Sequence, residues 1–445
     1  MSSFTTGVAG GSGLDVQSVV EQILQAERAP QRLLQRQQQT IDAQAAALRS
    51  LQSQLDRFEA SINALKDVSG VLGTRNVTSS DQEILTATSS SEAVLGTHTV
   101  CVSRLATTAS WYSNRLANPN ATFSPGSFDI QVGTSPSVTV TLGDGRNTLA
   151  SAAAYINTLG LGVTASVVND AQGARLSLAS KSSGAPGNIS ITNDSTSLGL
   201  TRGVTGTNAQ LTVDGIPLEA ASNTVQGVLQ GITIRLGSAS PSTQVTLQVA
   251  PDTAKLTAAV RDMVSSYNAL VNSINTQFAV NPETGSAGVL AGDSTLRVLQ
   301  GRLLSIPSFV FDGSGTYKTL ASLGVTMKND GTLAADDAAV STAVSSHYED
   351  FRKFFYSVSP AGFAVRMSTE LMALTDSTDG PLTVTLSGLN ATTRSIADQM
   401  DAFEARLADR EKQLYDQYSR IDVMLRKLPT LQSQLTAQLG SLNQK

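Results

Sequence analysis

The pattern of apolar positions near the start of the chain predicts a short amphipathic helix. Asp15 is a suitable N-cap for it, and Pro30 is expected to break or kink it at Ala29. A helix of about 14 residues is marginal in water, so it needs a surface to pack against. Its apolar residues are three or four positions apart and share one face: Val16, Val19, Val20, Ile23 and Leu24.

Longer helices with a seven-residue apolar repeat are predicted near both ends of the chain, and this spacing is typical of helices that pack along a common seam. After Pro30 the repeat is Leu34, Ile41, Leu48, Leu55 and Ile62. Near the C-terminus it is Met400, Leu407, Leu414, Ile421, Leu428, Leu435 and Leu442. As coiled-coil core residues we predict Leu48, Leu55, Ile62, Met400, Leu407, Leu414 and Ile421. Pro429 is expected to separate a long helix, ending near Leu428, from a short one.

These seams fit two arrangements, an intramolecular helical bundle or an axial coiled coil whose outer ends bind other subunits. The outermost short helices have no third helix nearby in the sequence to bury them. Because exposed apolar helices usually mark interaction sites, this feature favours the second arrangement.

The middle of the chain alternates apolar and polar residues with a period of two, which predicts β-strands. FDIQV (128–132) and VTVTL (138–142) are examples, and LTVDGIPL (211–218) predicts a hairpin with Asp214-Gly215 at its tip. Helical spacing resumes at Thr253. We therefore predict an α+β fold, in which a discontinuous helical coiled-coil and bundle domain from both termini carries inserted β-rich head domains.

The same pattern predicts the domain boundaries. We expect a flexible N-terminal segment (1–40), a helical leg domain (41–77 and 252–428), a β-rich head domain (78–120 and 205–251), an inserted β-β-α-β-β head domain (121–204) and a flexible C-terminal helix (429–445). Residues 1 to about 40 and those after about 430 are expected to be mobile in the free protein. Strong protection from hydrogen exchange there would contradict this expectation.

Composition narrows the possible functions. Only 15% of the residues are charged, against about 25% in average proteins. The net charge of -5 and the pI near 5.2 argue against a nucleic-acid partner. With one cysteine, Cys101, the chain forms no intramolecular disulfide. It contains neither a run of 18 apolar residues, as a membrane span requires, nor a secretory signal peptide at its start.

The sequence contains no pattern typical of catalysis. The two histidines, His98 and His347, have no metal-ligand spacing with the lone cysteine. Asp336-Asp337 is a carboxylate pair, but adjacent residues on a helix do not face each other, so it indicates a helix start. We expect no enzyme activity, no cofactor and no metal.

Several blocks, in this order along the chain, resemble the flagellar filament cap family, also called hook-associated protein 2. They are GLDVQSVVEQILQAERAP (13–30), TSSDQEILTATSSSEAVLGTHTVCVSRLA (78–106), NAQLTVDGIPLEAASNTVQGVLQGITIRL (208–236), SYNALVNSI (266–274), LAGDSTLR (290–297), LGVTMKNDGTLAAD (323–336) and the C-terminal coil. TLASAAAYINTLGLGVTASVVNDAQGARLSLAS (148–180) is similar to a small insert of flagellins and hook-associated proteins. The resemblance covers nearly the whole chain.

The resemblance implies a structural cap, secreted by the flagellar type III apparatus and located at the filament tip. It implies a homo-oligomeric ring, a pentamer or similar, with flagellin and a hook-associated junction protein as partners. A cytosolic export chaperone is implied for roughly 401–442. As filament-contacting residues we predict Leu14, Val19, Val20, Ile23, Leu24, Leu431, Leu435 and Leu442; alternatively, the two short helices pack against each other in the free subunit.

Two other functions stay open at this point. A Ser/Thr/Asn-rich β domain could act as an adhesin for host glycans or mucin, although Trp111 and Tyr112 are the only close aromatic pair in the insert. The chain could also be another flagellar axial subunit, such as a junction protein.

Overall fold

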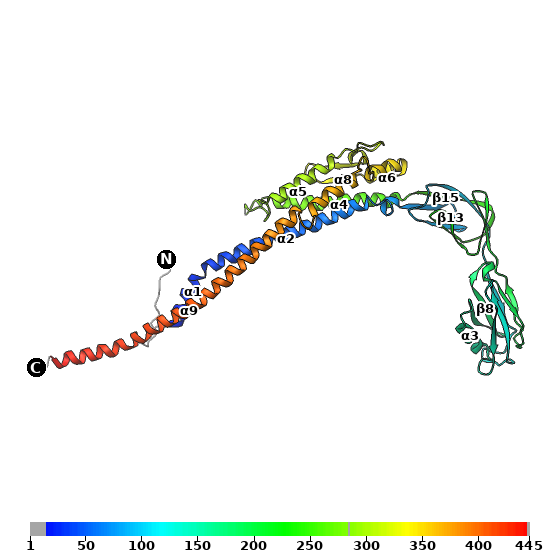
Figure 1. The fold of residues 1–445 in the computed structure, drawn as a ribbon, viewed down its shortest axis with the longest axis horizontal. Coiled ribbons are helices and arrows are strands. Elements are labelled where there is room, and N and C mark those ends of the chain that lie inside the picture. Colours follow the sequence, from blue (N-terminus) through cyan, green and yellow to red (C-terminus); the bar gives the residue numbers. More distant parts are fainter. Residues whose placement is uncertain (1–14, 284, 443–445) are drawn as a thin grey trace.

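The computed structural model describes residues 15–283 and 285–442 and confirms the α+β fold class. The molecule is elongated and bent, with a helical leg, a helical bundle and two β-rich heads in succession (Figure 1). The leg lies at the end of the molecule where both termini are found, and the heads lie at the other end. The chain therefore leaves the helical part once, builds both heads, and returns.

The helical bundle forms around the second half of a long N-terminal helix. Its helices are α2 (Ala29–Ala64), α4 (Thr253–Phe278), α5 (Ser294–Ser305), α6 (Asp337–Ser346), α7 (Tyr348–Phe355), α8 (Phe363–Thr375) and the start of α9 (Pro381–Leu442), with the small hairpin β16 (Val325–Met327) and β17 (Leu333–Ala335). Asp293 and Asp336 cap α5 and α6 by accepting backbone N–H groups, and for α6 this is the helix start that the sequence indicates. Leu48, Leu55 and Ile62 are fully buried in the core of this bundle.

Tyr267 is the largest fully buried side chain of the bundle core. Its hydroxyl donates to the Leu303 carbonyl oxygen at 3.2 Å, and its ring meets Phe58 edge-on with centroids 5.6 Å apart. Burial disfavours the charged phenolate and raises the pKa of Tyr267 to about 12.

An alkaline titration tests this environment. One tyrosine is expected to ionise near pH 12, well after the exposed tyrosines, when tyrosinate absorbance is followed. Because the unfolded chain loses this proton near pH 10, the bundle should lose stability as the pH rises from about 10 towards 12. Tyr267→Phe should remove the late step, and a late step that persists in this variant would contradict the assignment.

The first head is a sandwich of two antiparallel sheets over one apolar core. The larger sheet has the order β1 (Arg75–Ser79), β15 (Ser240–Pro251), β3 (Gly96–Arg104), β11 (Ala209–Val213) and β12 (Ile216–Ala220). The smaller has the order β13 (Thr224–Leu229), β14 (Ile232–Leu236) and β2 (Leu85–Ser89). The predicted hairpin is β11–β12, in which Val213 pairs with Ile216 and Asp214 and Gly215 both have positive φ, as a two-residue turn requires.

The second head has its own core between two further sheets and one helix. The four-stranded sheet has the order β10 (Thr201–Val204), β4 (Thr108–Tyr112), β8 (Gly173–Ser183) and β7 (Val163–Asp170). The three-stranded sheet has the order β6 (Val138–Leu142), β5 (Gly126–Val132) and β9 (Ile189–Thr192), and the helix is α3 (Leu149–Thr158). Strand β4 lies in the range 78–120 that the sequence pattern assigned to the first head. Because β4 pairs with β8 and β10, these residues belong to the second head instead.

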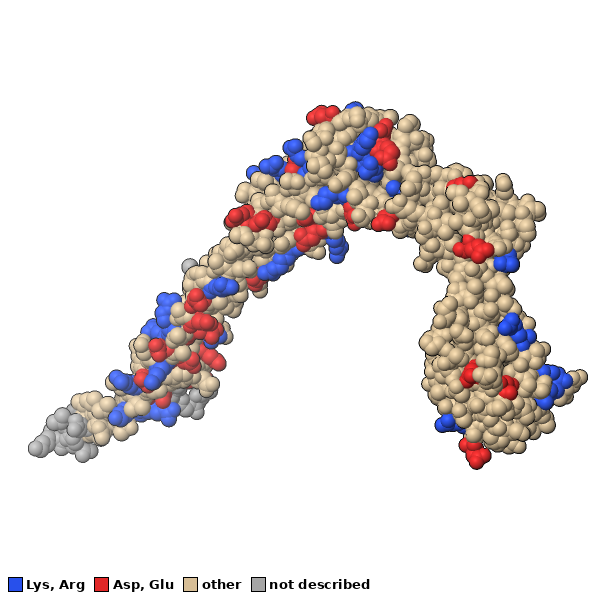
Figure 2. Space-filling model, turned by 45° about the vertical axis from the view of Figure 1, so that its right-hand side comes forward, with Lys and Arg blue, Asp and Glu red and all other residues tan. Residues whose placement is uncertain are grey.

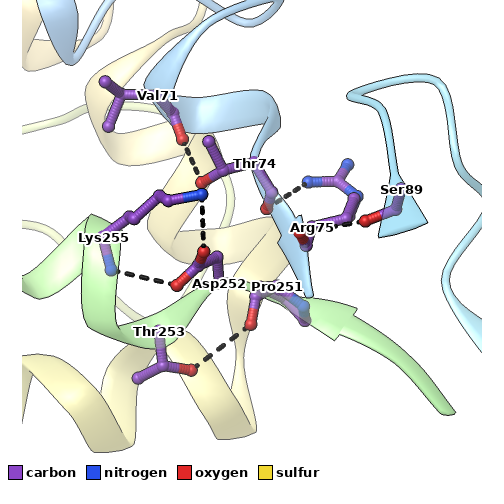
Figure 3. A network of polar contacts seen from close by, with 8 residues as sticks. All are labelled: Val71, Thr74, Arg75, Ser89, Pro251, Asp252, Thr253 and Lys255. Carbon is purple, nitrogen blue, oxygen red and sulfur yellow. Dashed lines mark hydrogen bonds and ion pairs between the residues drawn. The ribbon is translucent and has the colours of Figure 1, made fainter. Parts of the chain in front are cut away.

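Two chain crossings join the bundle to the first head, and polar contacts hold them together (Figure 3). Asp252 caps α4 by accepting the Lys255 N–H at 3.1 Å, and its carboxylate pairs with Lys255 Nζ at 3.1 Å. The Asp252 N–H donates to the Thr74 carbonyl oxygen of the other crossing at 3.1 Å. Arg75 donates from Nη1 to the Tyr348 hydroxyl at 2.8 Å. The head is thus held to the bundle through both strands at once.

The two prolines expected to interrupt the terminal helices behave differently. Pro30 lies in the first turn of α2, after α1 (Val16–Glu27) has ended, where a missing N–H costs nothing. Pro429 lies inside α9, which continues to Leu442, so the predicted separate C-terminal helix is wrong. The lost hydrogen bond leaves the carbonyl of Leu425 on a solvent-exposed stretch where water can satisfy it.

The helical elements also cross both predicted boundaries of the flexible ends. Residues 15–40 form α1 and the first part of α2, and residues 429–442 continue α9 without interruption. Residues 1–14 and 443–445 lie outside the described residues, so the expectation for them is not addressed.

Candidate interaction surface on the helical leg

Helix α1 packs along α9 and forms a small apolar cluster far from the three larger cores (Figure 1). The Asp15 carboxylate accepts the Ser18 N–H at 3.2 Å and so fixes the first turn of α1, as the sequence predicts. The buried members of the cluster are Val20, Leu24, Leu407 and Leu414. Partly buried side chains around them are Val16, Ile23, Phe403, Tyr415 and Tyr418.

Two polar contacts flank this cluster on its bundle side. Arg410 pairs with Glu27 at 3.2 Å, and the Gln31 side-chain amide donates to the Glu404 carboxylate at 2.7 Å. The ion pair is partly exposed, and such pairs contribute at most about 1 kcal/mol. Apolar burial therefore holds α1 on α9.

The apolar row of α9 continues beyond the end of α1. Leu407 and Leu414 are 8% and 3% exposed, whereas Ile421, Leu428 and Leu435 are 37%, 54% and 58% exposed. No described helix lies against this part of α9, which extends alone past α1 (Figure 1). We call Ile421, Leu428, Leu431 and Leu435 the uncovered row.

The uncovered row lies on an uncharged stretch from Leu428 onward. Charged side chains of both signs follow the leg and the bundle, whereas the described end of α9 is free of them on the face in view (Figure 2). The sequence carries no charged residue from 428 to 442. Large exposed apolar surfaces without nearby charge are typical of contact sites for other proteins.

The structure places the predicted contact residues in three different situations. Val20 and Leu24 are buried against α9 in the single chain, so they do not form an exposed contact face, and Val19 and Ile23 are half-buried. The structure does not show the alternative, in which the two short helices pack against each other, because α1 packs on residues 403–418 of α9 and not on the stretch after Pro429. Leu431 and Leu435 are exposed. Leu14 lies outside the described residues, and Leu442 ends α9 without a described side chain.

The predicted core residues of α9 differ in how far they are buried. Leu407 and Leu414 are buried and Met400 is half-buried, but Ile421 is exposed, so its assignment to the core is wrong. Heptad spacing specifies which side of a helix is apolar, not where the partner helix ends. Leu425 and Leu439, at 39% and 60% exposure, were missed because they lie outside the two registers used in the prediction.

The two histidines lie away from this surface, His98 in β3 and His347 between α6 and α7. Within residues 15–283 and 285–442, no three His, Cys, Asp or Glu side chains gather as metal ligands. His98 contacts Asp214 at 2.7 Å on the surface of the first head, and this hydrogen bond holds the pKa of Asp214 below its ordinary value. The pair lies at the β11–β12 turn, where it ties the hairpin to β3.

Two other expectations can be compared with the described residues. The Trp111 indole is partly buried and donates to the Ile189 carbonyl oxygen at 2.9 Å, so it does not form an exposed platform for a sugar. None of the helices in the described ranges combines the length and apolar character that crossing a membrane requires.

Comparisons with known proteins identify related chains. The family described as flagellar hook-associated protein 2 C-terminus matches residues 206–430, which is 225 of 445 residues. Its N-terminal counterpart matches residues 12–109, and the flagellin hook IN motif matches residues 127–182 in the second head.

Individual relatives match most of this chain. The B-type flagellar hook-associated protein 2 of Pseudomonas aeruginosa is 29% identical over 84% of this chain and 85% of its own. Flagellar hook-associated protein 2 of Escherichia coli K12 is 27% identical over 96% of both chains. The solved D1-D2-D3 domains of the flagellar cap protein FliD from Escherichia coli match with a TM-score of 0.60 and 26% identity, over 77% of this chain and 99% of that one. The chain belongs to the flagellar hook-associated protein 2 family.

Proposed function

We propose that this chain caps a bacterial flagellar filament at its tip, where it promotes folding and insertion of exported flagellin and prevents flagellin loss. Family membership supports this function, as does the likeness to a solved flagellar cap protein over 77% of this chain. A role in assembly rather than catalysis agrees with a surface whose most distinctive feature is an uncovered apolar row.

The position of the uncovered row carries the proposal. It lies at the end of the leg, and the two heads lie at the opposite end of the molecule (Figure 1). In a homo-oligomeric ring, a pentamer or similar, the heads would form a plate and the legs would reach the filament. Leu431, Leu435 and Leu442 would then contact the filament, together with Leu14 before α1.

Family membership also supports the proposed partners. Flagellin and a hook-associated junction protein would meet the ends of the legs. Before secretion through the flagellar type III apparatus, a cytosolic export chaperone would cover roughly residues 401–442, since exposed leucines there would otherwise promote aggregation. The Val20 and Leu24 side chains would reach an outside partner only after α1 leaves α9.

Deletion of the gene tests the function directly. Without the cap, cells are expected to form hooks without filaments and to lose monomeric flagellin into the medium, measured by immunoblotting and electron microscopy. Reintroduction of the wild-type gene should restore filaments. Normal filaments with reduced attachment to host surfaces would contradict the proposal and indicate an adhesin instead.

A further inference from the structure

One apolar row runs along α9, and α1 covers only its first part. Residues seven positions apart face nearly the same side of a helix, so Leu414, Ile421, Leu428 and Leu435 lie on one face. The packing of α1 ends beside Tyr418, just before the row becomes exposed. The uncovered row is therefore a direct continuation of the interface that α1 already occupies.

Helix α1 can leave this interface without unfolding α2. Arg28 separates the two helices, and Pro30 has no N–H, so the helical hydrogen-bond ladder is already interrupted there. Only Val20 and Leu24 of α1 are buried, so the gain from apolar burial comes from two side chains. Ordering the 12 residues of α1 offsets much of that gain.

We propose that α1 is a displaceable cover on a docking seam that extends from Leu407 to Leu435. The occupant that the seam fits is a helix of another chain with the chemistry of α1, weakly charged and with apolar residues three or four positions apart. α1 itself shows that such a helix packs on Leu407 and Leu414. The uncovered row repeats these side chains at the same spacing, and from Leu428 onward it lies on a stretch without charge.

The length of the seam makes α1 a regulator of docking. From Ile421 to Leu435 the helix is about 21 Å long, which is about four turns. A partner helix up to this length docks beside α1, whereas a longer one must displace α1 to gain the Leu407–Leu414 part. Because α1 is tethered at about millimolar effective concentration, it makes occupation of that part selective for strong partners.

A fluorescent peptide of residues 13–30 of this chain serves as the probe, added to the full-length protein and followed by anisotropy. The wild-type protein is expected to bind it on the uncovered row. Leu428→Asp with Leu435→Asp should weaken binding at least about ten-fold, because a carboxylate cannot be buried unpaired. Val423→Asp is the matched control, since Val423 is also exposed on α9 but lies off the row, and it should leave binding unchanged.

A second experiment tests whether α1 competes for the seam. It measures peptide binding after α1 is detached from α9 in the variant that carries Leu428→Asp and Leu435→Asp. Adding Val20→Asp and Leu24→Asp to Leu428→Asp and Leu435→Asp should restore binding about ten-fold, because the tethered competitor no longer occupies Leu407 and Leu414. Failure of the wild type to bind, or of the fourfold variant to regain binding, would overturn the proposal. The late ionisation of Tyr267 reports that the bundle is folded in each variant. No flagellar component enters the assay, so its failure would leave the proposed cap function standing.

Discussion

Cells whose only copy of this protein carries Leu431→Asp and Leu435→Asp are expected to release flagellin monomers and to form few or no filaments. Both leucines are exposed on the uncovered row, so the folded subunit should be unaffected. Burial of each leucine in a partner contributes about 1.5–3 kcal/mol, so losing both should weaken a leg contact at least about a hundred-fold. Secreted flagellin in the medium and filament counts by electron microscopy measure the effect.

Val423→Asp provides the matched control for this experiment. It adds one carboxylate to the same exposed helix without changing the uncovered row, and we expect near-normal filaments. Equal secretion of the variants must be verified, because defective export would also abolish filaments. Filaments of normal number and length on cells carrying Leu431→Asp and Leu435→Asp would show that the row is not a filament contact.

The largest effect on stability is expected from Phe58→Ala. Phe58 is 1% exposed and packs edge-on against Tyr267 in the bundle core. Removing a buried phenylalanine costs about 3–5 kcal/mol, through lost burial and the cavity left behind. Leu33→Ala on the same helix is the control, because Leu33 is 62% exposed and its truncation should change stability by less than about 0.5 kcal/mol.

Because the bundle and the two heads have separate cores, the loss of stability in Phe58→Ala can be assigned to one of them. The single tryptophan, Trp111, packs against the core of the second head, whereas most of the helix is in the leg and bundle. In urea, far-ultraviolet circular dichroism should report an earlier transition for Phe58→Ala, and Trp111 fluorescence should report an unchanged one. A shift of both transitions by the same amount would mean that bundle and head unfold as one unit.

Much of the fold follows from local sequence patterns. The period-two segments became strands, with β6 at the predicted residues, and α4 begins at Thr253, where the helical spacing resumes. Leu48, Leu55 and Ile62 are buried because a helix with one apolar side must bury that side when neighbouring helices are present.

The errors concern relations between distant segments. Ile421 has the same spacing as Leu414, but exposure depends on where α1 ends, which the α9 sequence does not contain. Strand β4 has no local feature that assigns it to either head; its partners β8 and β10 decide this from more than 60 residues away. Pro429 remains helical because this part of α9 is solvated, a property of the surroundings rather than of the residue.

Because both heads are inserted within the helical part, the chain connectivity determines the order in which the parts of the protein can fold. Residues 65–252, 188 in all, separate the end of α2 from the start of α4, its partner in the bundle core. During synthesis, or during passage of an unfolded chain with its N-terminus first, the second head closes over its own contiguous residues. The first head, whose β1–β3 precede the second head, is completed only when β11–β15 follow, and α2 must await α4 and α9. At about 5–20 residues per second on the ribosome, the 188 residues that precede α4 alone take about 10–40 seconds. The bundle is the last part to mature, and a chain interrupted before α9 would carry finished heads on an unassembled support.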